Sequence, residues 1–199
     1  AFCDITKYTA PRINDRTLIE AAKQGSRAGV ISALLKGDDI DGTDIHGHTA
    51  LVNALNHGHL NLVHLLVERG ASIDIIDDDG YSPLMWATHK GHESEVEMLL
   101  EEGADPLVQN RDGFTALMMA AQENRVGIAR LLLEHETAPH RTLHVGPRAH
   151  SVPTTTHGDT ALSIAIREKN DRIASMIRET VAAEEAAAEE AAAGAAGDL

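Results

Sequence analysis

A period of 33 residues runs through most of this 199-residue sequence and limits the possible folds more than any other feature. A further copy, GDTALSIAI, starts at Gly158 after about 12 additional residues. Chains with such a period form arrays of small units, because one unit alone cannot bury its apolar side and stacked units can. The period is carried by Leu18, Leu51, Leu84 and Leu117, and by Gly47, Gly80 and Gly113.

Each copy predicts two short helices joined by a tight turn. Gly58 and Gly91 suit the turn, and Gly70 and Gly103 suit the left-handed conformation that ends a helix. Aromatic residues are only 3% of the chain, and the apolar residues are mostly aliphatic, which favours helix packed on helix. In four copies a hydroxyl residue that can cap a helix precedes the first apolar run: Thr49, Ser82, Thr115 and Thr160.

The stretch GYSPLMWATHKGHESEVEMLLEEGAD, from Gly80, resembles the ankyrin repeat, with its T-P-L-H-x-A, G-H and L-L-x-x-G-A elements. The resemblance covers roughly residues 15–178 and implies an all-α, ankyrin-type solenoid of about five helix-turn-helix repeats with short β-hairpin-like fingers. The fourth unit departs from the pattern, with Asn124 for the turn glycine and Glu136 for the helix-ending glycine. The histidine of T-P-L-H is replaced by Val52, Met85, Met118 and Ser163.

The chain divides into three predicted segments. Residues 1–14 form an N-terminal arm that either lies on the first repeat or docks a partner. Residues 15–179 form the ankyrin repeat domain, with a loop insertion at 137–156. Residues 180–199 form an Ala/Glu-rich helical tail, which continues a helix expected from about Asp171 to about Ala193. A solvated tail is favoured over one that binds a partner.

Charge and composition exclude several classes of function. The formal net charge of −14 predicts no nucleic-acid partner and favours a basic protein partner. Cys3 is the only cysteine, so no internal disulfide can form. No run of about 18 apolar residues is found, which predicts no membrane span. The cytoplasm is the default expectation, although a removed targeting segment stays open, as does the oligomeric state.

Motifs for catalysis are missing. The sequence contains no nucleophile elbow, phosphate loop or dinucleotide fingerprint, so we predict no enzyme, no catalytic residue and no cofactor. DIIDDDGYSPLMW fails as a calcium loop, because Ile75 and Trp86 would take ligand positions, and Asp77 to Asp79 are interpreted as a solvated turn. No metal site is predicted, and a metal-dependent enzyme is the least favoured alternative. It would use histidines near the insertion that match no metal template: His135, His140, His144, His150 and His157.

The resemblance also implies a binding surface. In ankyrin repeats the fingers and the exposed side of each first helix line a concave face that is the usual site for partners. The matching positions of the fifth unit are His157, Asp159, Arg167 and Glu168. Those of the second to fourth units, which we predict to bind a partner, are Ile45, His46, His48, Asn56, His57, Asp78, Asp79, Tyr81, Trp86, His89, Lys90, Arg111, Asp112, Phe114, Gln122 and Glu123.

Three of the five aromatic residues, Tyr81, Trp86 and Phe114, belong to this set. Tyr81 and Phe114 hold the same place in adjacent units, and packed helices lie about 8–10 Å apart, so their rings are predicted to be neighbours. Exposed aromatic side chains flanked by charge are typical of binding hot spots. The alternative is that Trp86 packs between units and the other two rings brace neighbouring fingers.

We therefore expect a non-catalytic protein–protein interaction module, either an adaptor or a subunit of a larger assembly, that binds through the concave face. Asp78, Asp79 and Asp112 favour a partner segment that is basic and carries an apolar anchor. The alternative is a regulatory or inhibitory subunit of an enzyme that acts through the 137–156 loop.

Overall fold

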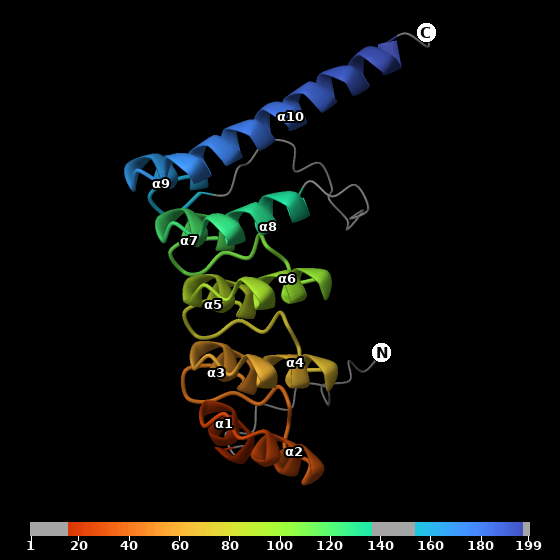
Figure 1. Ribbon diagram of the computed structural model, residues 1–199, viewed down its shortest axis with the longest axis vertical. Helices are drawn as coiled ribbons and strands as arrows, with labels where there is room; N and C mark the ends of the chain where they lie inside the picture. The colour runs from red at the N-terminus through yellow and green to blue at the C-terminus, as the bar shows by residue number, and fades with distance from the viewer. Residues whose placement is uncertain (1–15, 137–153, 197–199) are drawn as a thin grey trace, which may run out of the picture. The chain divides into compact units, whose positions relative to one another are not determined.

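A computed structural model describes residues 16–136 and 154–196 (Figure 1). These residues form ten α-helices and no β-strand. The predicted arm at 1–14 and most of the loop insertion lie outside the described residues. The helices of the first to third repeats are α1 (Arg16–Lys23), α2 (Arg27–Leu35), α3 (Ala50–Asn56), α4 (Leu60–Glu68), α5 (Pro83–Lys90) and α6 (Glu93–Glu101). The fourth and fifth repeats hold α7 (Ala116–Gln122), α8 (Val126–Glu136), α9 (Ala161–Arg167) and α10 (Asp171–Ala196).

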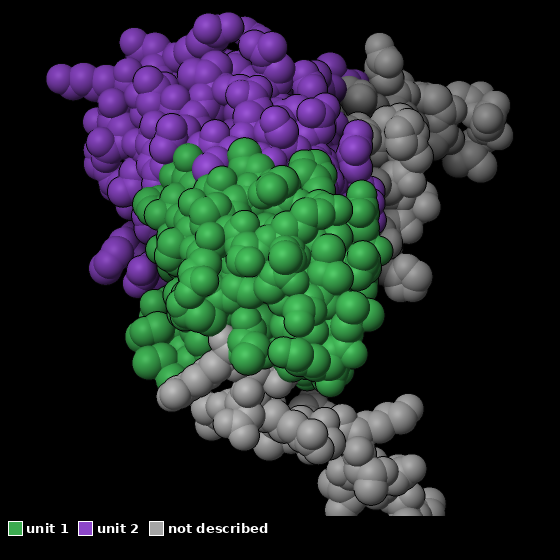
Figure 2. Space-filling model, turned by 60° about the horizontal axis from the view of Figure 1, so that its bottom comes forward, with its two compact units in different colours: residues 1–90 green, residues 91–199 purple. Residues whose placement is uncertain are grey.

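The chain separates into two compact units, residues 1–90 and 91–199, with the division between α5 and α6 (Figure 2). In the first unit, α1 packs against α2 and α3, and α3 packs against α4 and α5. In the second unit, α7 packs against α8 and α9, while α8 contacts both α6 and α10. Within each unit, first helices thus stack on first helices, and in the second unit the second helices α6, α8 and α10 also stack on one another. This arrangement is the stack of helix pairs that the period predicts.

The predicted helix caps are confirmed. Val52 N–H donates to the Thr49 hydroxyl over 3.3 Å, and Met85 N–H donates to that of Ser82 over 3.3 Å. The matching bonds onto Thr115 and Thr160 are 3.4 and 3.1 Å long. Each cap satisfies one backbone N–H group that has no partner inside its helix, so each first helix begins at the same point of the repeat.

The core is built from small and aliphatic side chains. Ala54, Ala87 and Ala120, one in each of three successive first helices, have no exposed surface. Alanine at this position lets the helices approach closely, and leucine fills the space around it, as in the fully buried Leu51 and Leu62. A polar exception is Thr88 in α5, which is fully buried.

Thr88 should be a site at which stability can be gained. Its hydroxyl has no hydrogen-bond partner among the described residues, and burying such a group costs free energy. Thr88→Val keeps the shape of the side chain and should raise the free energy of unfolding by about 1 kcal/mol in urea denaturation. Thr49→Val is the matched control, because the hydroxyl removed there caps α3, and it should lower stability by about 1 kcal/mol. Loss of stability in Thr88→Val would contradict this account.

In the second and fifth repeats, the residue just after the turn between the two helices reaches back to the preceding repeat. His59 Nε2 lies 3.0 Å from the carbonyl oxygen of Lys23, the last residue of α1. Because a carbonyl oxygen only accepts, that nitrogen carries the proton. In the fifth repeat, Asn170 occupies the same position and donates to the Ala121 carbonyl in α7 over 2.6 Å. These side chains close the C-terminal ends of first helices, so His59 has a structural role.

Candidate functional site

In the second to fifth repeats, the finger, which is the turn that precedes a first helix, is closed by one side chain that accepts two backbone hydrogen bonds. In the third repeat, Asp77 Oδ1 accepts from the N–H groups of Asp79 and Tyr81 over 3.0 and 2.8 Å. In the fourth, Asn110 Oδ1 accepts from the N–H groups two and four residues further on, over 3.0 and 2.9 Å. Asp44 and Thr155 do the same in the second and fifth repeats. The position therefore requires a side-chain oxygen rather than one residue type.

The same fingers explain the hairpin-like shape that the resemblance implied. The backbone N–H of each closing residue donates to the carbonyl four residues later, over 3.0 Å at Asp44, 3.1 Å at Asp77, 3.0 Å at Asn110 and 2.9 Å at Thr155. An isolated β-bridge, Thr43 to Thr49, is added in the second repeat. The fingers are thus narrow hairpins that contain no strand in the described part of the chain.

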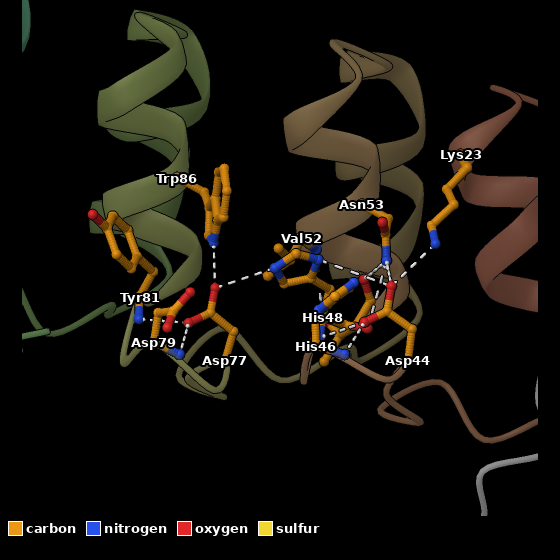
Figure 3. Close-up of polar contacts among 11 residues, drawn as sticks. Lys23, Asp44, His46, His48, Val52, Asn53, Asp77, Asp79, Tyr81 and Trp86 are labelled. Carbon is orange, nitrogen blue, oxygen red and sulfur yellow. Dashed lines mark hydrogen bonds and ion pairs between the residues drawn. The ribbon is translucent and has the colours of Figure 1, made fainter. Parts of the chain in front are cut away.

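Asp77 also organises the face of α5. Its second oxygen, Oδ2, accepts from Trp86 Nε1 over 2.9 Å and lies 3.4 Å from His48 Nε2 (Figure 3). Asp77 is only 6% exposed, so its carboxylate is buried, with three N–H donors and His48 Nε2 around it. The interpretation of this segment as a solvated turn is therefore wrong for Asp77. The sequence DDD does not show that the first aspartate points inward, toward a tryptophan nine residues later.

Asp44 holds the corresponding place in the second repeat and has a cationic partner. Its Oδ2 lies 3.1 Å from Lys23 Nζ, and its side chain is 11% exposed. Burial alone would raise the pKa of the Asp44 carboxyl, but the N–H groups of His46 and His48 and the Lys23 ammonium together hold the pKa below its ordinary value of 3.8. Asp44 is thus stabilised as an anion by its surroundings.

His48 links the two fingers. Its Nε2 faces Asp77 Oδ2 at 3.4 Å, and its Nδ1 lies 3.9 Å from Asp44 Oδ2. The backbone joins the same fingers, because Asp78 N–H donates to the His46 carbonyl over 3.1 Å. A line of polar contacts therefore runs from the first repeat to the third: Lys23, Asp44, His48, Asp77 and Trp86 (Figure 3).

Four rings gather on this line, and we refer to them as the ring cluster: His48, Tyr81, Trp86 and His89. Trp86 is at the centre, with ring centroids 5.6 Å from Tyr81, 5.4 Å from His48 and 6.1 Å from His89. The two histidine rings stand nearly perpendicular to the indole, at 83° and 78°. The Lys90 ammonium lies over the indole ring, 5.7 Å from its centroid. The cluster presents aromatic surface that is partly exposed and held in one orientation.

A family model for ankyrin repeats, which spans three copies of the repeat, matches residues 18–110 and again residues 102–185. The chain belongs to the ankyrin repeat family. A search of the curated proteins found no match. Ankyrin repeats are generally protein–protein interaction modules and are typically non-catalytic, and the all-helical fold described above is that of an ankyrin solenoid.

All sixteen residues predicted to bind a partner of this ankyrin repeat protein are accessible to some degree. The exposed ones are Ile45, His46, His57, Asp78, Asp79, His89, Arg111, Asp112 and Gln122. The half-buried ones are His48, Asn56, Tyr81, Trp86, Lys90, Phe114 and Glu123. Their role in binding stays a prediction. The proximity of the Tyr81 and Phe114 rings also stays a prediction, because the two residues belong to different units. Sequence reasoning missed Lys23, Asp44 and Asp77, although the period places both aspartates at one repeat position.

No helix among the described residues of the ankyrin repeat protein is both long and apolar enough to cross a membrane. Within 16–136 and 154–196, no three acidic, histidine or cysteine side chains are grouped so that they could hold a metal ion. Of the five histidines considered for a metal site, His140, His144 and His150 lie outside those ranges.

The charge of Asp44 should make the ankyrin repeat protein sensitive to acid. A carboxyl whose pKa is lowered by folding contributes stability above its unfolded value, here 3.8, and that contribution is lost as pH falls through the folded pKa. Asp44→Asn keeps an oxygen for the backbone N–H groups and removes the charge. In urea denaturation it should be less stable than the wild type at pH 7, with a smaller difference at pH 3. The exposed Asp74→Asn is the control, and an Asp44→Asn difference that does not shrink would contradict the assignment.

Proposed function

We propose that this ankyrin repeat protein binds a protein partner through its fingers and first helices, as an adaptor or as a subunit of a larger assembly. The observation that carries the proposal is the ring cluster around Trp86. A half-buried indole, hydrogen-bonded to a buried carboxylate and flanked by three rings, loses little side-chain freedom when a partner covers it. Aromatic side chains held in this way are typical of the residues that dominate binding energy.

Charge indicates the kind of partner. Asp78, Asp79 and Asp112 are exposed at finger tips, and the chain carries a formal net charge of −14. A negative field of this kind speeds the approach of a basic segment and disfavours acidic ones. The proposed partner segment is therefore rich in Lys or Arg and carries an apolar anchor.

Two experiments test the proposal in sequence. Cross-linking mass spectrometry on the native protein would identify the partner, and stoichiometric links to one large assembly would distinguish a subunit from an adaptor with varied partners. The affinity of that partner is then measured by calorimetry for the wild type and for the pair of substitutions Tyr81→Ala and Phe114→Ala. Loss of two hot-spot side chains should weaken binding at least about 30-fold.

The control is the pair Leu35→Ala and Val181→Ala, which removes two exposed apolar side chains that lie on second helices, outside the proposed surface. It should leave the affinity unchanged. Equal binding by the Tyr81/Phe114 double variant and the wild type would refute a binding surface to which these two side chains contribute.

A further inference from the structure

The ring cluster already holds one cation. Lys90 Nζ lies 5.7 Å from the centre of the Trp86 ring, inside the range at which an ammonium is attracted to an indole face. Lys90 and Trp86 are four residues apart on α5, so the contact forms within one helix. Both side chains are half-buried. The indole face is therefore in contact with a positive charge that comes from the protein itself.

The surroundings of Trp86 strengthen its attraction for a cation. Its indole N–H donates to the Asp77 carboxylate over 2.9 Å, which places an anion at one edge of the ring and increases the electron density of the indole. Asp77 is buried, so its field is less screened by water than that of a surface carboxylate. Asp78, exposed on the same finger, adds negative charge nearby.

The neighbouring rings keep the indole in place. Tyr81 is tilted by 42° to it, while His48 and His89 stand nearly perpendicular. His48 is itself held by its contact with Asp77. The indole thus stays oriented when the mobile end of the Lys90 side chain leaves it, because none of these contacts involves Lys90.

We propose that the face of Trp86 is a receptor for one arginine side chain of the partner, and that Lys90 occupies it as an internal competitor in the free protein. The inference rests on the proposed function and specifies its chemistry at one position. A guanidinium is planar, stacks on indole and is less strongly hydrated than an ammonium, so arginine displaces lysine from an aromatic face. The exposed carboxylates and the net charge of −14 favour a cationic ligand over a neutral or acidic one.

Trp86 is the only tryptophan, so its fluorescence reports on this position alone. The probe is a capped peptide with one arginine next to a leucine, spaced by glycine and serine. A second peptide carries citrulline, which has the shape of arginine without its charge. The arginine peptide should change Trp86 fluorescence, and the citrulline peptide should not. Lys90→Met, which keeps most of the length of the side chain and removes its charge, should bind the arginine peptide about two- to fivefold more tightly.

Three results would overturn the inference. Equal affinity of Lys90→Met and the wild type would show that Lys90 does not compete. Equal binding of the citrulline peptide would show that charge is not recognised. An acidic peptide that perturbs Trp86 in the wild type and not in Lys90→Met would make Lys90 itself the recognition group.

Failure here is distinguishable from failure of the proposed function. If calorimetry shows that the arginine peptide binds Trp86→Leu as well as the wild type, the cation is held by the finger carboxylates. The proposed protein-binding function would then remain, but Trp86 would not be the receptor for the arginine. Circular dichroism checks that each variant is folded. Trp86→Leu removes a donor from Asp77, and this loss can unfold the variant. In that case two comparisons still test the inference: Lys90→Met against the wild type, and the arginine peptide against the citrulline peptide.

Discussion

Asp77→Ala is expected to lower the free energy of unfolding by about 3 kcal/mol, a loss typical of a buried charged group removed from its partners. The carboxylate accepts from two backbone N–H groups and from the Trp86 indole, and it faces His48 Nε2. Alanine leaves these donors in a buried site with no acceptor. Urea denaturation, followed by circular dichroism and by Trp86 fluorescence, measures the loss.

Asp77→Asn divides this loss into two parts. Asn110 shows that an asparagine at this position still accepts from the two backbone N–H groups of its finger. Its amide nitrogen, however, cannot accept from the Trp86 indole or from His48. We therefore expect a loss of about 1–2 kcal/mol, with a changed Trp86 emission in the folded state. An alanine variant as stable as the asparagine variant would show that the backbone bonds contribute nothing.

Gly47→Ala is the second substitution with a large expected effect, about 3 kcal/mol. Gly47 has φ of +77°, a conformation that costs an alanine about 1 kcal/mol or more. A Cβ atom there would also lie 2.8 Å from the backbone nitrogen of Asp78 and 3.1 Å from Cα of Asp77. Because these are backbone atoms of the adjacent finger, they cannot move aside as a flexible side chain would, and the overpacking adds a further 1–3 kcal/mol.

Gly70→Ala is the matched control, since Gly70 has a similar φ, +85°, and a Cβ atom there would have no neighbour within 4 Å. Its free energy of unfolding should fall only by the cost of a positive φ for alanine, about 1 kcal/mol. The difference between the two variants in urea denaturation measures the close approach of the second and third fingers. If the two substitutions lower the free energy of unfolding by the same amount, the adjacent finger moves to make room for the added Cβ atom at Gly47.

Features that depend on the local backbone were predictable from the sequence. The hydroxyl groups of Thr49 and Thr115 cap their helices, and Gly70 and Gly103 adopt the left-handed conformation. Both features depend only on residues within about one helical turn along the sequence. The departure at Asn124 changes little for the same reason. Asparagine tolerates the left-handed region better than most residues and adopts φ of +56° in place of the glycine.

The candidate site was only partly predictable, because its key contacts join different repeats. Tyr81 and Trp86 were both placed on the predicted surface, and their ring centroids are 5.6 Å apart. The burial of Asp77 was not expected, since it depends on His48 from the preceding repeat and on the indole of the following helix. A run of three aspartates carries no signal for which one turns inward. The signal that existed was the alignment of Asp77 with Asn110 by the period.

The back-reaching side chains have a consequence for how the chain is made. The first helix of the first repeat ends at Lys23, whose carbonyl is closed by His59, 36 residues later in the sequence. The Ala121 carbonyl accepts from Asn170, which is 49 residues later in the sequence. Translation adds about 5–20 residues per second, so the first contact becomes available roughly 2–7 s after its helix has been synthesised. The first and fourth repeats are thus completed by the repeats that follow them, and a chain interrupted before His59 or before Asn170 ends in a repeat whose first helix lacks its closing partner.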